Sequence, residues 1–269
     1  MCRVVNIFWN LMSYFWSKFR TNPYFLLRYF ALQSFVVLSV IFLVIKFSLG
    51  LDINFESTPY YLLPIALFIG IKVPTMMHNC FHKNFKSFNF FIGELTSSFV
   101  LMGFGIMCVN HTFHHSFADT DSDPHNPEGK SFSMFFLTAI FGGIGIIEQK
   151  HLEFHGATLK NRLIFKLNIF LHFSGIPLRI AAWYYLLGNE LFLYLYIPSF
   201  IFYLFSFAHV NYVTHETNSE GESIILNKNS NAWYQFVNFV GDGVYFHKNH
   251  HHNPSLYNPK HFEVGLTND

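Results

Sequence analysis

The sequence predicts an all-α integral membrane protein with four transmembrane helices in two hairpins, interfacial helices and a cytoplasmic histidine-rich cap. Three observations support this fold class: low charge, long apolar stretches and clustered histidines. Only 12% of the 269 residues are charged, whereas a soluble domain carries about a quarter. Such a chain cannot easily cover itself with a water-facing surface, and a lipid-facing surface solves that problem. We expect one domain over residues 1–269 and, from the net charge of +1, no nucleic-acid partner.

The first predicted element is an amphipathic helix over residues 4–20. Its apolar side chains, among them Phe8, Leu11 and Phe15, recur at three- and four-residue steps. A helix of this kind is typical of the membrane surface, and an ordinary packing helix is the alternative. We expect no cleavable signal peptide, because no apolar run with a small-residue cleavage site follows the first basic residue.

Six apolar stretches follow this helix, and a spanning helix needs about 20 apolar residues. They cover residues 29–49, 59–77, 88–109, 131–147, 163–187 and 191–210. The first, second, fifth and sixth fit spans well, although Lys166 and Arg179 interrupt the fifth. The third contains Glu94, and the fourth is short and rich in glycine, which weakens a helix.

The orientation follows from the placement of lysine and arginine. These residues precede the first and fifth stretches and follow the second and sixth, whereas the connections over 50–58 and 188–190 contain none. By the positive-inside rule, both termini face the cytoplasm. The Asp52–Ser57 loop and the Gly188–Glu190 turn then face the other side, which gives a multi-pass protein.

Histidines gather at the ends of these stretches. The 16 histidines include the clusters MHNCFH, HTFHH and HKNHH, and Asn211 lies four residues before the histidine of NYVTH. Positions i, i+3 and i+4 share one face of a helix, and imidazole suits iron, copper, zinc and nickel. A single HxxxH pair is weak evidence for a metal site, because an interfacial or hydrogen-bonded pair explains it better. Several such clusters at membrane edges predict a metal site. The clustered histidines are His78, His82, His111, His114, His115, His215, His247, His250 and His251.

The metal hypothesis also constrains the topology. Two metal ions that share chemistry lie about 3.5–4 Å apart, so the clusters must meet on one side of the membrane. If residues 88–109 crossed, the HTFHH cluster would emerge about 30 Å from the others. We therefore expect 88–109 to lie along the surface or to dip in and return, and 131–147 not to cross.

The number and type of ligands favour two iron ions. Nine histidines are too many for one metal and reasonable for two, and this nitrogen-rich set leaves positions open for O2. Iron is preferred because O2 activation needs a redox metal, and zinc has no redox chemistry. The three cysteines show no paired spacing, so neither a disulfide framework nor an iron–sulfur site is expected. Electrons must then come from a separate protein.

These motifs resemble the three histidine boxes of the membrane fatty acid desaturase superfamily, from about residue 59 to 258. HTFHH with the downstream run SFADTDSDPHNP resembles the second box of acyl-CoA desaturases, and GDGVYFHKNHH resembles the third box. The first-box spacing is closer to acyl-lipid desaturases, carotenoid-modifying oxygenases and alkane hydroxylases. The resemblance implies a cytoplasmic di-iron centre held by the nine histidines, with Asn211 bound through water, and an acyl chain in a buried tunnel.

The function that this resemblance implies is O2-dependent desaturation of a fatty acyl chain, with a ferredoxin or cytochrome b5 type of protein as electron donor. A hydroxylase or ketolase of a lipid, alkane or carotenoid is the alternative within the same chemistry. A histidine-rich metal transporter or sensor without redox chemistry is the alternative from another class. Such proteins more often place His and Asp inside the spans.

Metal-bound histidines usually donate their second ring N–H to a carboxylate or carbonyl. Asp119, Asp121, Asp123 and Asp242 are the candidates for that role. We expect it of Asp123 and Asp242, which lie nearest the family-like motifs, while a solvated acidic loop explains Asp119 and Asp121 equally well. The remaining histidines carry no such prediction: His125 contacts substrate or caps a turn, His151 and His155 lie at the surface, and His172 and His209 are neutral hydrogen-bonded residues of the spans. His252 lies beside the third histidine cluster without an expected role as a ligand, and the position of His261 predicts no function.

Overall fold

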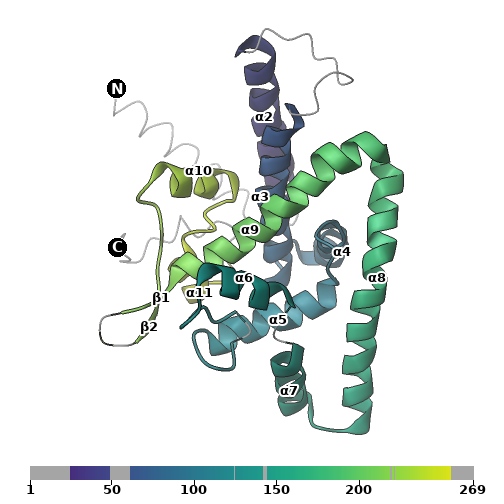
Figure 1. Cartoon of the computed structure of the whole chain (residues 1–269), viewed down its shortest axis with the longest axis vertical. Helices are drawn as coiled ribbons and strands as arrows, with labels where there is room; N and C mark the ends of the chain where they lie inside the picture. Colours follow the sequence, from purple (N-terminus) through teal and green to yellow (C-terminus); the bar gives the residue numbers. More distant parts are fainter. Residues whose placement is uncertain are drawn as a thin grey trace.

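The computed structural model describes residues 25–48 and 61–255, apart from 124, 142–143, 219 and 221. The predicted helix over 4–20 and the Asp52–Ser57 loop lie outside the described residues. Almost every described element is a helix (Figure 1). The helices are α2 (Phe25–Ser48), α3 (Leu62–Phe81), α4 (Asn89–Phe99), α5 (Phe104–Phe117), α6 (Phe132–Phe141), α7 (Ile144–His155), α8 (Leu159–Leu191), α9 (Ile197–Thr214), α10 (Ala232–Val240) and α11 (His247–His252). Two short helical turns, η2 (Lys86–Phe88) and η3 (Phe192–Tyr196), precede α4 and α9.

Three described helical segments are long and apolar enough to cross a membrane. They are Leu26–Phe47, Leu62–Phe81 and the 56-residue run Leu159–Thr214. A straight helix of the last length would measure roughly 84 Å, far more than the thickness of the apolar core of a bilayer. Gly188 breaks it with φ 71° and ψ 172°, so α8 and α9 meet at a turn (Figure 1). The predicted apolar helices are thus present, with a glycine at the expected turn.

Helix α3 packs along α9 at close range, and glycine makes this approach possible. A β-carbon added at Gly70 would lie only 2.6 Å from the Ser199 carbonyl oxygen. Pro74 lacks the N–H that would bond the Gly70 carbonyl within the helix. The Ser206 hydroxyl of α9 lies 3.5 Å from that carbonyl and donates to it. The two helices therefore meet along a seam of small residues, as is typical of membrane helix pairs.

The apolar stretch over 88–109 does not form one straight helix. Lys86–Phe99 and Phe104–Phe117 meet at an angle of 96°, and Leu101 adopts a left-handed φ of 60° between them. Such a bend occurs both in a broken span and in a segment that enters the membrane and returns, so the expectation that this stretch does not cross stays a prediction. The stretch over 131–147 is likewise divided, between α6 and the start of α7.

One element lies outside the all-α prediction. Strands β1 (His215–Thr217) and β2 (Ser223–Ile225) form an antiparallel hairpin directly after α9, with His215 opposite Ile225. The strand backbone ends the long helix at His215, whose φ of −112° and ψ of 107° are extended. This change of backbone places the His215 ring beside those of His114, His247 and His251, with centroids 5.0, 5.1 and 5.4 Å away.

Candidate metal centre

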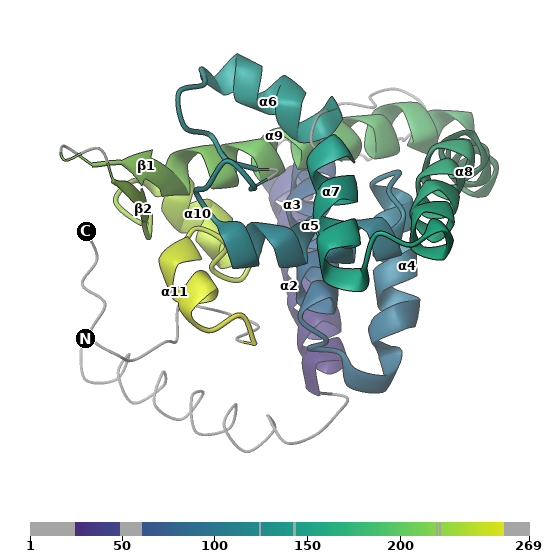
Figure 2. The same cartoon turned by 90° about the horizontal axis from the view of Figure 1, so that it is seen from below.

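The clustered histidines come from three helices and one strand. His78 and His82 lie at the end of α3, the HTFHH histidines in the last turns of α5, and the HKNHH histidines on α11, while His215 begins β1. Figure 2 shows α5 and α11 close to one another although more than 100 residues separate them in sequence. The fold thus brings together all nine histidines that the sequence singled out.

The nine imidazoles form two groups, and within each group the available ring nitrogens all lie within 4.8 Å of one another. The first group, here called group one, is His78, His82, His111, His115 and His250. The second, here called group two, is His114, His215, His247 and His251. These are the only groups of three or more metal-ligating side chains in the described part of the chain.

Each HH doublet is divided between the two groups. His114 belongs to group two and its neighbour His115 to group one, and the same holds for His251 and His250 on α11. Consecutive residues of an α-helix point about 100° apart, since 3.6 residues complete a turn. Two helices that each present a doublet can therefore serve two adjacent sites at once.

The spacing of the ring nitrogens in group one is that of ligands around a common ion. The Nε2 atoms of His82 and His111 are 2.8 Å apart, those of His111 and His115 3.1 Å, and those of His115 and His250 2.9 Å. Neighbouring ligands at right angles around a metal with bonds of about 2.1 Å are about 3.0 Å apart. A shared cation attracts all of these lone pairs, whereas ring protons can satisfy only part of the arrangement.

Group two shows the same spacing and an unpaired nitrogen. His251 Nε2 lies 3.2 Å from Nε2 of both His114 and His247. His215 Nε2 is buried and has no hydrogen-bond partner in the described residues. A buried polar atom without a partner is costly, and a metal ion among these nitrogens would satisfy it. The residues present therefore fit a metal in both groups.

Two carboxylates orient the rings of group two. His114 Nδ1 donates to both oxygens of Asp123 at 3.0 Å, and His215 Nδ1 donates to Asp119 Oδ1 at 2.7 Å. The proton on Nδ1 leaves Nε2 with a lone pair that points into the group. Asp123 also accepts from the backbone N–H groups of His125 and Asp119. Burial raises the pKa of Asp123, and the backbone N–H of His125 opposes that rise.

Burial holds the imidazoles of His82, His247 and His250 neutral, as metal ligands must be. Burial lowers the pKa of His82 to about 4. Burial, and then repulsion by neighbouring imidazoles, lowers the pKa of His247 and His250 well below the ordinary value. Each effect disfavours the charged ring, so these lone pairs are available near pH 7.

Asp242 has a different environment from the one that we expected. Its carboxylate contacts no histidine of either group through the hydrogen bonds that the structure shows; it forms a buried ion pair with Lys72 Nζ at 2.5 Å and accepts from Tyr29 at 2.8 Å. The physical reason is its place on a turn against α2 and α3, with left-handed φ values at Asp242 and Gly243. Sequence reasoning missed Lys72, although a lysine inside an apolar stretch is itself a signal of a buried partner.

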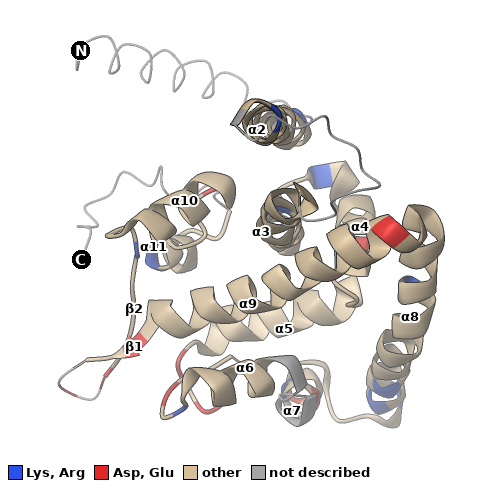
Figure 3. Ribbon diagram, turned by 45° about the horizontal axis from the view of Figure 1, so that its top comes forward, with Lys and Arg blue, Asp and Glu red and all other residues tan. Residues whose placement is uncertain are grey.

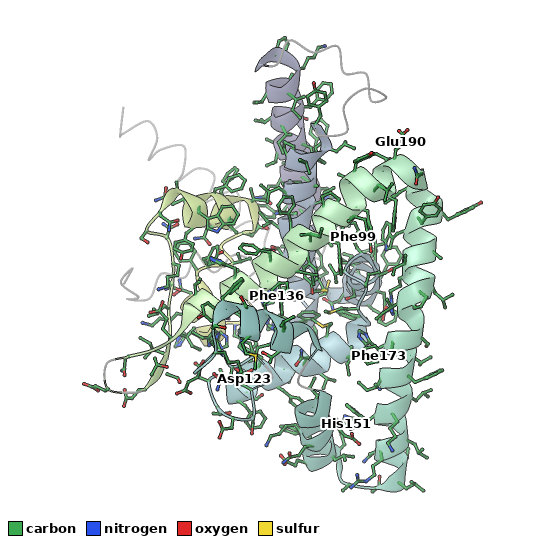
Figure 4. All side chains as sticks on the ribbon, viewed as in Figure 1. Phe99, Asp123, Phe136, His151, Phe173 and Glu190 are labelled. Carbon is green, nitrogen blue, oxygen red and sulfur yellow. The ribbon has the colours of Figure 1, made fainter. Side chains whose placement is uncertain are left out.

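The other expected residues also have defined places. Asn211 is buried on α9, four residues before His215, and its side-chain amide donates to the Phe207 carbonyl. Asp121 is exposed, which agrees with a solvated loop, whereas Asp119 proved to be a histidine partner. His125 is buried beside His114, with ring centroids 5.7 Å apart, and bonds Asn110. His151 lies on α7, apart from Asp123 of the centre (Figure 4).

A cavity adjoins both groups of histidines. Its polar wall includes His78, His111, His114, His247 and Asn211, and its apolar wall includes Ile71, Met77, Met107, Phe207, Val210 and Val237. The apolar residues come from α3, α5, α9 and α10. An apolar space beside a set of convergent polar groups is typical of a site for a largely apolar ligand.

The fold and this site define a class: helical membrane proteins with a histidine-rich metal centre beside an apolar cavity. The sequence matches the fatty acid desaturase family over residues 56–261. The chain belongs to the fatty acid desaturase family, as its histidine motifs predicted. Comparison with curated protein sequences and with solved structures gave no match. The family implies oxidoreductase activity, a lipid substrate and association with a membrane.

Replacing Asp123 by asparagine is expected to weaken metal binding about 10–100-fold, the usual effect of losing a carboxylate that orients a ligand histidine. The amide cannot hold the Nδ1 proton of His114 as a carboxylate does. Competition with a chelator, followed by metal analysis of the purified protein, measures the effect. Asp121→Asn in the same loop is the matched control, since Asp121 is exposed. Equal metal affinity of the two variants would contradict the assigned role.

Proposed function

We propose that this protein catalyses the O2-dependent desaturation of a fatty acyl chain at a di-iron centre ligated by histidines, with electrons from a separate donor. The observation that carries the proposal is the convergence of nine ring nitrogens in two groups beside a cavity with apolar walls, in a member of the fatty acid desaturase family. Iron bound there would supply the reduction of O2.

The chain's own residues would bind the metal, place the substrate and exclude water. Groups one and two would each hold one Fe2+, and Asn211, buried four residues before His215, would bind through water as the tenth member of the set. Asp123 and Asp119 would keep the group-two rings in the tautomer that binds metal. The apolar cavity wall would hold the acyl chain against the centre, because correct placement is most of what the protein can contribute.

The reaction balances with O2 and an external reductant. Two hydrogen atoms leave neighbouring CH2 groups, and O2 with two electrons and two protons yields one double bond and two molecules of water. A ferredoxin or cytochrome b5 type of protein would supply the electrons. The second candidate is hydroxylation or ketone formation on a lipid, alkane or carotenoid. The same nitrogen set and cavity serve that reaction, and the outcome depends on how the substrate lies.

We propose four crossings, α2, α3, α8 and α9, with both termini in the cytoplasm. The charges on α8 support this orientation. Its first half carries Lys160, Arg162 and Lys166, whereas Glu190 lies near its other end at the turn into α9 (Figure 3). In this arrangement the end of α3 and the end of α9, which carry His78 and His215, face the same side of the membrane.

Expression in a heterologous host, followed by mass spectrometry of its lipids, tests the function. New double bonds that require O2 are expected from the native protein, and none from His114→Ala. His155→Ala, an exposed histidine of α7 outside both groups, is the matched control and should keep the activity. New hydroxyl or keto groups would select the second candidate. Purified protein that contains zinc and gives no O2-dependent product would contradict both and point to a metal transporter or sensor.

A further inference from the structure

The bend between α4 and α5, residues 98–103, is only partly closed by hydrogen bonds of its own backbone. Leu101 N–H donates to the Ser98 carbonyl and Met102 N–H to the Ser97 carbonyl, whereas Gly103, which precedes α5, makes no side-chain cap. The ends of a helix leave carbonyl and N–H groups without partners inside the helix. When such groups are buried they need partners from elsewhere, because an unpaired one is costly.

Side chains of distant helices add hydrogen bonds to the groups at this bend. Trp183 Nε1 on α8 donates to the Ser98 carbonyl at 3.1 Å, and the Tyr196 hydroxyl of η3 donates to the Phe99 carbonyl at 2.9 Å. On the other side of the bend, the Gly103 backbone N–H donates to His172 Nδ1 at 3.0 Å. The end of α4 and the start of α5 are thus both tied to the long apolar helices.

Ring packing reinforces these hydrogen bonds. Phe99 meets Trp183 and Tyr196 edge to face, with centroids 5.3 and 5.0 Å apart, and Trp183 stacks on Tyr196 (Figure 4 labels Phe99). Tyr196 is only 1% exposed. Aromatic pairs of this geometry contribute beyond their buried area, so the bend is fixed in direction as well as hydrogen-bonded.

The direction of α5 matters because that helix carries three of the nine histidines. His111 lies roughly two helical turns beyond Gly103, and His114 and His115 follow on the same helix. Their neighbours in the two groups come from α3, α11 and β1. A small rotation of α5 at the bend would therefore move three ring nitrogens relative to the other six.

We propose that His172, Trp183 and Tyr196 are positioning residues, which hold the bend and through it set the placement of the α5 histidines. The inference rests on the proposed function for its catalytic readout, whereas its metal-binding readout does not. None of the three belongs to either histidine group or lines the cavity, so each acts through the backbone of the bend.

Two variants of His172 distinguish the effect of its hydrogen bond from the effect of its size. His172→Leu removes the acceptor for the Gly103 N–H, whereas His172→Asn keeps an oxygen close to the position of Nδ1. We expect His172→Leu to lower kcat about tenfold, as a displaced ligand set does, with less metal per chain and a changed distribution of oxidation positions along the acyl chain. His172→Asn should restore most of all three.

Tyr196→Phe removes one hydroxyl and keeps the ring, so it folds even if a larger change does not. The single variants Tyr196→Phe and Trp183→Phe should each lower kcat several-fold and shift the oxidation position. Tyr185→Phe is the control, because Tyr185 on α8 is 88% exposed, and it should leave both quantities unchanged. Parent values of metal content, kcat and product position in the folded Tyr196→Phe and His172→Leu proteins would overturn the proposal, even if their yield fell. If the native protein gives no lipid product, the proposed function fails, and metal content alone still decides the positioning role.

Discussion

His250→Ala and His251→Ala are each expected to remove about one bound metal ion per chain and to lower activity at least about 100-fold, more than the loss of an orienting carboxylate costs. The two residues are neighbours on α11, yet His250 belongs to group one and His251 to group two. Each variant therefore empties a different site. Because the two ions would act together on O2, loss of either should stop the reaction.

Metal analysis and turnover measure this effect, and α11 offers a control one residue further. His252 is exposed and belongs to neither group, so His252→Ala should retain both ions and the activity of the parent. Double replacement of His250 and His251 should remove both ions. If His250→Ala and His252→Ala bound the same amount of metal, the division into two groups would be wrong.

The single variants Asp242→Asn and Lys72→Met are expected to lower the free energy of unfolding by about 3–5 kcal/mol, the usual cost of leaving one charge of a buried pair without its partner. Lys72 and Asp242 are 2% and 1% exposed. Lys72 also bonds the Val240 carbonyl at 3.3 Å and the side chain of Gln33. Asparagine tolerates the left-handed φ of Asp242, so backbone strain does not add to the loss of stability measured for Asp242→Asn.

The double variant Lys72→Met/Asp242→Asn distinguishes an unpaired charge from lost packing. It should recover much of the stability, because neither charge is then buried alone. Retention of folded protein after heating in detergent, followed by size-exclusion chromatography, measures the series. Lys228–Glu216 is a pair of the same type with side chains 21% and 47% exposed, and Lys228→Met should cost less than about 1 kcal/mol. A double variant no more stable than the worse single one would contradict the assignment.

The sequence predicted which histidines form the candidate metal centre, but not how they divide between group one and group two. Spacing marked all nine histidines. The parity of the spans predicted that 88–109 would not cross the membrane, and the structure bends this stretch by 96°. Which histidine joins which group depends on the rotation of α5 and α11 against each other, and one-dimensional spacing carries no such information. The split of His114 from His115 could therefore emerge only from the packed structure.

The carboxylates show a second limit of sequence reasoning. Asp242 stood beside the third histidine motif, yet the turn at Gly241–Gly243 directs it to Lys72 on α3. A solvated loop and a histidine partner explained Asp119 equally well, and its left-handed backbone directs it to His215. Proximity in sequence predicts the partner of a side chain only within a regular helix or strand. Asp119 and Asp242 both lie at turns. The β1–β2 hairpin was missed for a related reason, since two three-residue strands give little periodicity.

The divided HH doublets have a consequence for where this chain can gain or lose a residue. A single residue inserted into α5 or α11 ahead of the doublet would advance each following side chain by about 100°. A histidine that binds one ion would then face the site of the other, and both sites would lose ligands together. An added or deleted residue would leave the phase of both helices unchanged if it fell in a connection such as residues 156–158, between α7 and α8. The rotation of each side chain about the axes of α5 and α11 thus decides which ion each histidine of the doublets would bind.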